Sequence, residues 1–194
     1  MPHSEGKPEK FSWITNKAFL SVFGALFALV FIALLILINV ATQVEDIEEK
    51  LKYIPPQPKG FEISEESIIA GQTIYVPVYS HIYSQGGKPF LLEATLSVRN
   101  SDPDNEITIR SVRYYDTNGK IIKKYLEKPL QIKPLATAEF LVKQKKIEGG
   151  SGANFIVEWV AKTKVNKPVI EAVMVGIDGQ TGISFIRPGV AIEN

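Results

Sequence analysis

The chain has 194 residues, enough for one ordinary domain with accessory segments, and 45% of them are hydrophobic, as in globular proteins. It contains no cysteine, which excludes disulfides, thiolate metal sites, a cysteine nucleophile and a lipid-modified cysteine. Only two histidines are present, so a histidine-rich metal site is excluded, and we expect neither a metal nor a cofactor. Residues 71–194 carry sixteen Lys and Arg against twelve Asp and Glu, which is far from the dense basic stripe that nucleic-acid binding usually needs.

The first expected element is a membrane-spanning helix over residues 18–40, which carry no charged side chain. A helix of about 23 residues is about 34 Å long, enough to cross the hydrocarbon core of a bilayer. The main alternative is a cleaved signal peptide, whose apolar region would be shorter and would end in small residues. Residues 39–42 make a poor cleavage site, so the sequence favours an uncleaved anchor in contact with lipid.

The orientation of this helix is predicted from the lysines at its two ends. Lys17 abuts the span, whereas the first base on the other side, Lys50, lies well beyond residue 40. Cytoplasmic flanks are richer in Lys and Arg, and Trp13 suits the interface on the same side. We therefore expect residues 1–17 to form a cytoplasmic tail of a single-pass protein of the inner (cytoplasmic) membrane, with the rest of the chain in the periplasm or the extracellular space.

Residues 41–70 are expected to form an acidic helical stem followed by a proline-rich spacer. They carry seven acids against three lysines. Within the stem, four apolar residues recur at spacings of three and four, the pattern of one helical face: Val44, Ile47, Leu51 and Ile54. One interpretation is a short parallel coiled coil that makes a homodimer. The other is a helix whose apolar face lies on lipid headgroups, and prolines at 55, 56 and 58 end either helix.

From residue 71 to residue 194 the hydrophobic pattern changes to a period of two, which is typical of strands with one buried face. Strand-like runs occur at 74–79, 92–99, 107–114, 120–126, 136–142, 154–161, 169–176 and 183–187. A change of phase near Arg110 and Ser111 predicts a β-bulge, and Asn118-Gly119 predicts a hairpin turn. Seven or eight such strands predict an all-β, antiparallel, immunoglobulin-like sandwich rather than a barrel.

Several strings of this segment occur together in one known family; they lie at 74–83, 96–100, 114–116, 119–120, 149–155 and 168–174. With them the chain resembles an uncharacterised bacterial family, the domain of unknown function 3124. The likeness covers nearly all of residues 71–187. It implies a bacterial source and an envelope protein, but it carries no established activity, so it assigns no site residue.

The first strand of the β segment contains the strongest candidate binding surface. Tyr75, Tyr79, His81 and Tyr83 alternate on one expected face, and tyrosines provide rigid contact area with a polar tip. Pro77 in the same run cannot donate a ladder hydrogen bond, which marks an edge or bulged strand. The alternative is that these tyrosines pack beneath neighbouring loops and that His81 is an ordinary surface residue.

The glycine-rich segment 149–152 resembles a phosphate-binding loop only in composition. It lacks the Lys-Ser/Thr pair of a P-loop and precedes a strand rather than a helix, so we expect a flexible hairpin connection. Asn154 beside it either caps this turn or lines a binding site. The cluster Asp102, Asp104 and Asn105 lacks the spacing of a calcium loop and is typical of a turn.

Catalysis is not expected. The carboxylates of Asp116, Glu158, Glu171 and Asp178 fall at outward strand or turn positions, and no serine or histidine accompanies them in a catalytic pattern. The leading hypothesis is a membrane-anchored, non-catalytic binding or scaffolding domain that contacts another envelope protein. The alternatives are a receptor domain for a small ligand or carbohydrate and a hydrolase that uses two carboxylates.

Overall fold

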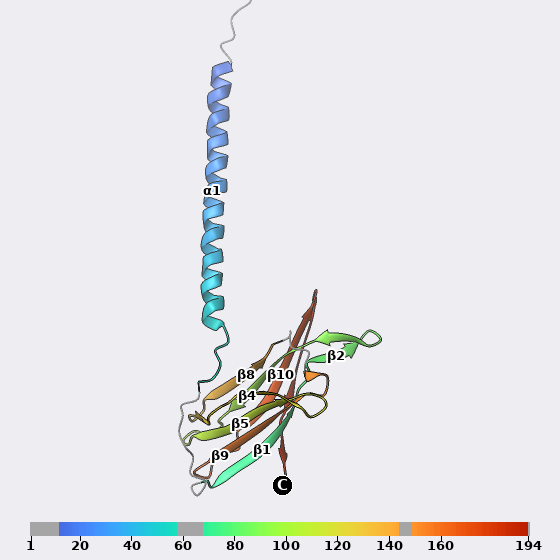
Figure 1. Cartoon of the computed structure of the whole chain (residues 1–194). Coiled ribbons are helices and arrows are strands. Elements are labelled where there is room, and N and C mark those ends of the chain that lie inside the picture. Colours follow the sequence, from blue (N-terminus) through green and yellow to red (C-terminus); the bar gives the residue numbers. More distant parts are fainter. Residues whose placement is uncertain (1–11, 58–67, 144–148, 194) are drawn as a thin grey trace, which may run out of the picture. The chain divides into compact units, whose positions relative to one another are not determined.

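The computed structural model describes residues 12–57, 68–143 and 149–193 (Figure 1). Most of the predicted tail and the middle of the predicted spacer lie outside the described residues. The chain divides into two compact units, Met1–Tyr53 and Ile54–Asn194, and each is described by itself.

The first unit is one long helix, α1 (Ser12–Leu51). It contains the whole uncharged run and continues into the acidic segment without a break. It ends at Leu51, shortly before Pro55, as the missing N–H and the rigid ring of proline require. Its apolar side chains are exposed, and the helix is long and apolar enough to cross a membrane. An N-terminal helix of this kind is consistent with a membrane anchor or a signal sequence.

The second unit is built from antiparallel sheets, and the described residues form twelve strands. One sheet has the order β12 (Val190–Ile192), β1 (Ala70–Pro77), β9 (Asn154–Ala161), β5 (Ile107–Tyr115) and β6 (Ile121–Lys124), with β7 (Leu130–Ile132) also paired to β5. The other has the order β11 (Thr181–Pro188), β10 (Val169–Asp178), β4 (Glu93–Arg99) and β8 (Thr137–Val142). A separate hairpin consists of β2 (His81–Ser84) and β3 (Lys88–Leu91).

One hydrophobic core joins the two larger sheets. It receives alternate residues from each of them, including Val76 of β1, Phe155 of β9, Leu96 of β4 and Met174 of β10, all of which are fully buried. Each buried side chain of this size stabilises the fold by about 1.5–3 kcal/mol. The period-two pattern of the sequence therefore marks the core-facing side of both sheets.

The antiparallel all-β class is confirmed, whereas the immunoglobulin-like strand order is not. In an immunoglobulin domain strand B pairs with E, and C pairs with F, on opposite sheets. The pairs β4–β8 and β5–β9 match this arrangement, but β10 lies beside β4 and β1 lies beside β9. The expected number of strands was also too low, because β2, β3, β7 and β12 have only three or four residues each and are too short to show a period.

Two local predictions are confirmed. The pairing of β5 with β9 shifts register between Ile109 and Ser111, where the sequence predicts a bulge. Asn118-Gly119 lies in the turn between β5 and β6, and Gly119 has a φ of +77°, which glycine adopts without strain. The turn is closed by a hydrogen bond from the Asp116 amide to the Lys120 carbonyl, 2.9 Å long.

Candidate functional site

The expected row of tyrosines on one strand does not exist. β1 ends at Pro77, and the chain then turns: the Val78 amide donates to the Ala153 carbonyl at 2.8 Å and the Ser80 amide to the Gly150 carbonyl at 3.1 Å. His81 begins the separate hairpin β2–β3. The prediction of a single face was wrong because a run of alternating residues does not reveal where a strand leaves its sheet.

The four members of that row consequently have different surroundings. Tyr75 is 37% exposed, whereas Tyr79 packs against the core, 5.8 Å from the Phe185 ring. His81 is buried, and its ring contacts that of Tyr83, which is 64% exposed, at a centroid distance of 5.0 Å. Of the four, Tyr75 and Tyr83 offer area to a partner, and they lie on different sheets.

The predicted edge position of β1 is only partly correct. β12 pairs with Thr73, Ile74 and Tyr75 on one side, while β9 pairs with the whole of β1 on the other. Pro77 lies beyond the residues that β12 covers, so its missing N–H interrupts no pairing with β12. The sequence contains no signal for β12, because it is three residues long and lies more than a hundred residues from its partner.

The glycine-rich segment is not a hairpin connection, because β8 and β9 belong to different sheets, and hydrogen bonds tie it to Thr117 and Ser80. The Gly149 carbonyl accepts hydrogen bonds from the amide and hydroxyl of Thr117, and the hydroxyl of Ser80 donates to the Gly150 carbonyl at 3.0 Å. Gly150 has a φ of +80°, and a Cβ there would collide with the Thr117 hydroxyl. Asn154, the first residue of β9, is half-buried opposite Pro77. These bonds place two sequence candidates, the segments 77–81 and 149–154, side by side.

A surface that the sequence analysis missed lies on the hairpin β10–β11. Val173, Val175 and Ile177 point to the side of β10 opposite the buried Met174, and Ile186 of β11 is the direct neighbour of Val173. Val175, Ile177 and Ile186 are 44%, 68% and 55% exposed. We call these four residues the hairpin strip. The signal was present, since Val173, Val175 and Ile177 alternate with the buried set of β10, but the pattern alone did not show that these three face solvent.

Beyond Val175 this hairpin is no longer paired to β4 (Figure 1). Gly176 marks that position, because a Cβ on it would meet the Phe90 ring at 2.5 Å and the Leu91 carbonyl at 2.7 Å. The hairpin β2–β3 therefore packs against the inner side of β10 at Gly176. The opposite side of β10 carries the hairpin strip.

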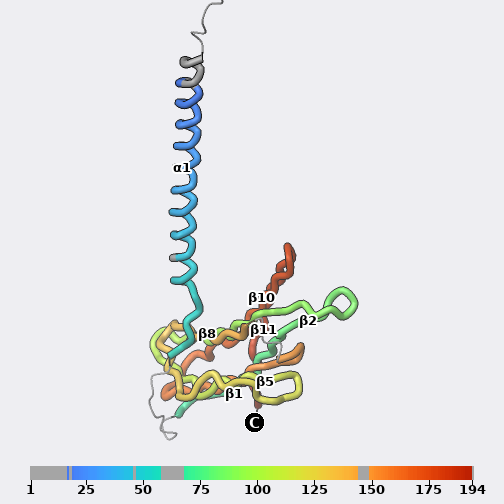
Figure 2. Tube along the Cα trace, turned by 45° about the horizontal axis from the view of Figure 1, so that its top comes forward, coloured from blue at the N-terminus to red at the C-terminus, as the bar shows by residue number. Residues whose placement is uncertain are grey.

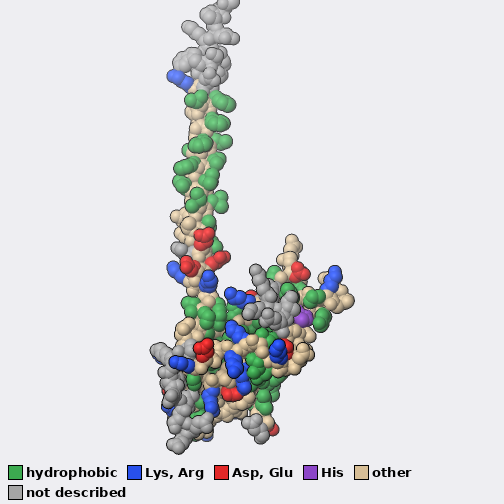
Figure 3. Space-filling model, in the orientation of Figure 1, with side chains coloured by type: hydrophobic (Ala, Val, Ile, Leu, Met, Phe, Trp, Pro, Cys, Tyr) green, Lys and Arg blue, Asp and Glu red, His purple; other side chains and the backbone are tan. Residues whose placement is uncertain are grey.

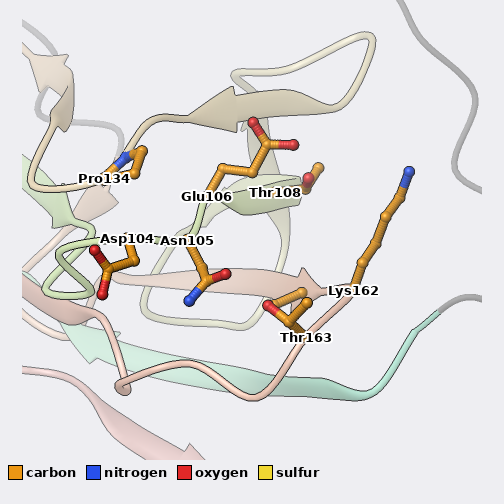
Figure 4. Close-up of a pocket in the computed structure, with 8 residues that line it drawn as sticks. Asp104, Asn105, Glu106, Thr108, Pro134, Lys162 and Thr163 are labelled. Carbon is orange, nitrogen blue, oxygen red and sulfur yellow. The ribbon is translucent and has the colours of Figure 1, made fainter.

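A cavity of about 320 Å³ lies elsewhere on the β unit (Figure 4). It is bordered by residues of the β4–β5 loop, the start of β5, the β7–β8 loop and the end of β9: Asp104, Asn105, Glu106, Thr108, Pro134, Ala161, Lys162 and Thr163. Figure 4 shows the first three along one loop, across from Lys162 and Thr163. Such a mixture of carboxylates, an ammonium group and hydroxyls provides both donors and acceptors for a polar ligand.

The neighbouring Asp102 has a structural role. Its carboxylate accepts hydrogen bonds from the amides of Asn166 at 2.9 Å, Asn105 at 2.8 Å and Asp104 at 3.1 Å. The Asn166 bond is the largest cause that lowers the pKa of Asp102 to about 2, followed by those of Asn105 and Asp104. Both carboxylate oxygens are engaged, in agreement with the interpretation of this cluster as a turn.

Buried Asn100 completes this polar cluster. Its side-chain amide donates to the carbonyls of Asn105 at 2.8 Å, Lys133 at 3.1 Å and Ile132 at 3.3 Å, and its oxygen accepts from the Asp102 amide. Buried carbonyls without donors would each cost about 1–3 kcal/mol. Asn100 and Asp102 therefore join three connections, β4–β5, β7–β8 and β9–β10, at the end of the β unit that bears the cavity.

Three of the four carboxylates that were considered for acid–base chemistry have other partners, and the fourth, Asp178, is exposed at the end of β10. Glu158 pairs with Arg113, and Glu171 lies 3.7 Å from Arg99. The Asp116 carboxylate accepts from the amides of Asn118 and Lys120 within its own turn. Within residues 12–57, 68–143 and 149–193, no group of three or more His, Asp or Glu side chains is arranged to hold a metal ion.

Comparison with known proteins places this chain in a family. A family model described as "Protein of unknown function (DUF3124)" matches residues 71–192, more than half of the chain. The chain belongs to this family. The match covers every strand except the first residue of β1, and it confirms the resemblance seen in the sequence strings.

Two further comparisons add no functional information. A search of curated proteins finds no match. Among solved structures, the chain is similar to one titled "Crystal Structure of Thermotoga maritima 1070", with a TM-score of 0.39 and 10% sequence identity. The similarity covers 61% of this chain and 92% of that one.

Proposed function

We propose that this DUF3124 protein is a membrane-anchored, non-catalytic binding or scaffolding module that contacts another protein of the bacterial envelope. The observation that carries the proposal is the hairpin strip. Four large apolar side chains lie together on one face of β10–β11, and three of them are at least 44% exposed. Contiguous exposed apolar area is uncommon on monomeric proteins and is typical of an interaction surface.

The anchoring and location belong to the same proposal. α1 serves as an uncleaved span of the inner membrane, with the N-terminus in the cytoplasm and the β unit in the periplasm or outside the cell. The support is the position of Lys17 at the N-terminal end of the apolar run, whereas the first base beyond its other end is Lys50. Figure 3 shows the C-terminal part of α1, where hydrophobic side chains give way to acidic and basic ones.

The binding role predicts loss of a partner when the hairpin strip becomes polar. Chemical crosslinking in the intact membranes of cells that make the protein, followed by its purification, would reveal a partner as a product of higher mass that contains a second protein, which mass spectrometry distinguishes from a homodimer. Ile177→Ser combined with Ile186→Ser should abolish that product, because both side chains are exposed and contribute nothing to the core.

A matched control is provided by β12 on the other large sheet. Val190 and Ile192 are also exposed, at 63% and 41%, so Val190→Ser with Ile192→Ser removes similar apolar area from a different face. This variant should keep the crosslinked product. Retention of the product in the hairpin variant would refute the role of the hairpin strip.

The cavity favours one second candidate, a receptor domain for a small polar ligand or carbohydrate. Its volume of about 320 Å³ is near the lower end of the range for small-molecule sites, about 300–1,000 Å³. A ligand held there would contact Glu106 and Lys162, so a Glu106→Gln, Lys162→Met double variant should lose saturable binding in a carbohydrate array. If the double variant keeps the binding of the wild type, the cavity is not the binding site.

A further inference from the structure

The part of α1 beyond the uncharged run carries one stripe of exposed apolar side chains. Val44, Ile47 and Leu51 are the large apolar residues in this last stretch of the helix, and they are 48%, 56% and 79% exposed. Their spacings of three and four residues place them on one face. Ile54, which the sequence pattern adds to the stripe, lies past the end of the helix.

This stripe continues the phase of the membrane-spanning part. α1 is a single unbroken helix in Figures 1 and 2, so Leu37 and Val40 precede Val44 on the same face, again at spacings of three and four. The distance along the axis from Val44 to Leu51 is about 10 Å. If the uncharged run is the span, the apolar seam continues beyond it over residues 41–51, which is about three turns.

A lipid surface does not suit this stripe. A helix that lies on headgroups must turn into the membrane plane, whereas α1 has no break between its uncharged run and Leu51. Such helices also present lysines and arginines to anionic lipids. Residues 41–51 instead carry four acids, Glu45, Asp46, Glu48 and Glu49, against one lysine, Lys50.

A second copy of the chain suits the stripe better than a lipid surface, in both geometry and charge. The same span fixes every copy at the same depth and in the same direction, so the stripes of two neighbouring copies lie at equal height. In a parallel pair Gln43 of one helix faces Glu48 of the other, which places no like charges opposite each other.

We propose that residues 41–51 of α1 form a parallel two-stranded coiled coil with the same segment of a second copy, with Val44, Ile47 and Leu51 in the seam. A contact this short does not hold free helices together in water. Anchoring in one membrane supplies the alignment and the high local concentration that free helices lack. The inference rests on the membrane anchoring proposed above and is independent of the binding role proposed for the β unit.

The absence of cysteine makes a direct test available. In the full chain, single substitutions Val44→Cys, Ile47→Cys and Leu51→Cys place a thiol in the seam. Glu45→Cys and Glu49→Cys place one on the outer faces of the same helix and serve as matched controls. Each variant is oxidised in native membranes with copper phenanthroline and separated on a non-reducing gel.

Disulfides need Cβ atoms about 3.5–4.5 Å apart. Facing seam positions in a parallel pair of helices come close to this distance, whereas outer positions lie much farther apart. The seam variants should shift from the 21.5 kDa monomer to a band of twice that mass, while the controls stay monomeric. Absence of dimer at all three seam positions, or equal dimer at seam and control positions, would overturn the proposal.

A second measurement tests whether lipid or another part of the chain, rather than a second copy, buries the stripe. Each variant is treated with a membrane-impermeant maleimide before oxidation. Seam thiols that resist the maleimide and also form no dimer are covered by lipid or by another part of the chain, which overturns the proposal. Seam thiols that resist the maleimide and do form dimers support it.

Discussion

At the scale of single residues, the carboxyl group of Asp102 gives the fold a dependence on pH. Its pKa is lowered from an ordinary value of 3.8 to about 2, mainly because the Asn166 amide donates to the charged carboxylate. A carboxylate with a lowered pKa stabilises the fold above its unfolded-state pKa and loses that contribution as the pH falls to its folded-state value. The loss therefore occurs between pH 3.8 and about 2.

The expected consequence is that Asp102→Asn flattens the acid response. The variant should be less stable than the wild type at neutral pH, because a neutral amide accepts these hydrogen bonds less strongly. Its free energy of unfolding should then fall less than that of the wild type between pH 4 and pH 2, a range that follows from the lowered pKa of Asp102. Urea unfolding of the full chain in detergent, followed by the fluorescence of buried Trp159, measures both effects.

Asp178→Asn serves as the control for this experiment, since Asp178 is exposed at the end of β10. It removes one carboxylate without touching the polar cluster. An Asp102→Asn variant with the same acid response as the wild type would show that the Asn166 contact does not stabilise the fold.

At the scale of elements, the packing of two hairpins depends on Gly176. A methyl group there would meet the Leu91 carbonyl at 2.7 Å, and a backbone atom cannot move aside as a side-chain end can. Gly176→Ala should therefore reduce the free energy of unfolding by about 1–3 kcal/mol, the usual cost of overpacking. Chemical denaturation of the full chain in detergent measures this change.

The same hairpin offers a control in Gly182 of β11, which pairs with Ile177 of β10. A Cβ added to Gly182 would lie in open space. Gly182→Ala should change stability by no more than about 0.5 kcal/mol. Equal effects of the two substitutions would contradict the packing of β2–β3 against β10.

For the whole molecule, the proposed topology predicts which side of the membrane each end occupies. A single cysteine introduced at exposed Thr181 should react with a membrane-impermeant maleimide in intact cells, because β11 would lie outside the cytoplasm. A cysteine at position 4 in place of serine should react only after the cells are opened. The opposite pattern would reverse the orientation, and a shortened membrane-free product would identify α1 as a cleaved signal sequence.

Much of the fold was accessible from the sequence, because period and turn chemistry act over a few residues. The limits of β9 were predicted to the residue, and the bulge near Ser111 and the turn at Gly119 lie where local signals placed them. Short strands such as β7 and β12 gave no period, and they form only because a distant strand is available to pair with them.

The candidate site was less accessible for the same reason. The tyrosines from Tyr75 to Tyr83 alternate correctly, but hydrogen bonds from Val78 and Ser80 to the segment 149–154 turn the chain out of its sheet. The hairpin strip could not be predicted, because the sequence shows which residues are apolar but does not show which side of β10 is buried by the rest of the fold.

By itself, the sequence determined the long apolar helix, the antiparallel β class and the family, since each depends on composition, local period or strings of neighbouring residues. Tertiary structure alone decided the order of the strands, the polar cluster around Asn100 and Asp102, and the exposure of β10–β11. These features depend on contacts between segments far apart in the chain, and the burial of a side chain is a property of the packed sheets rather than of its neighbours in sequence.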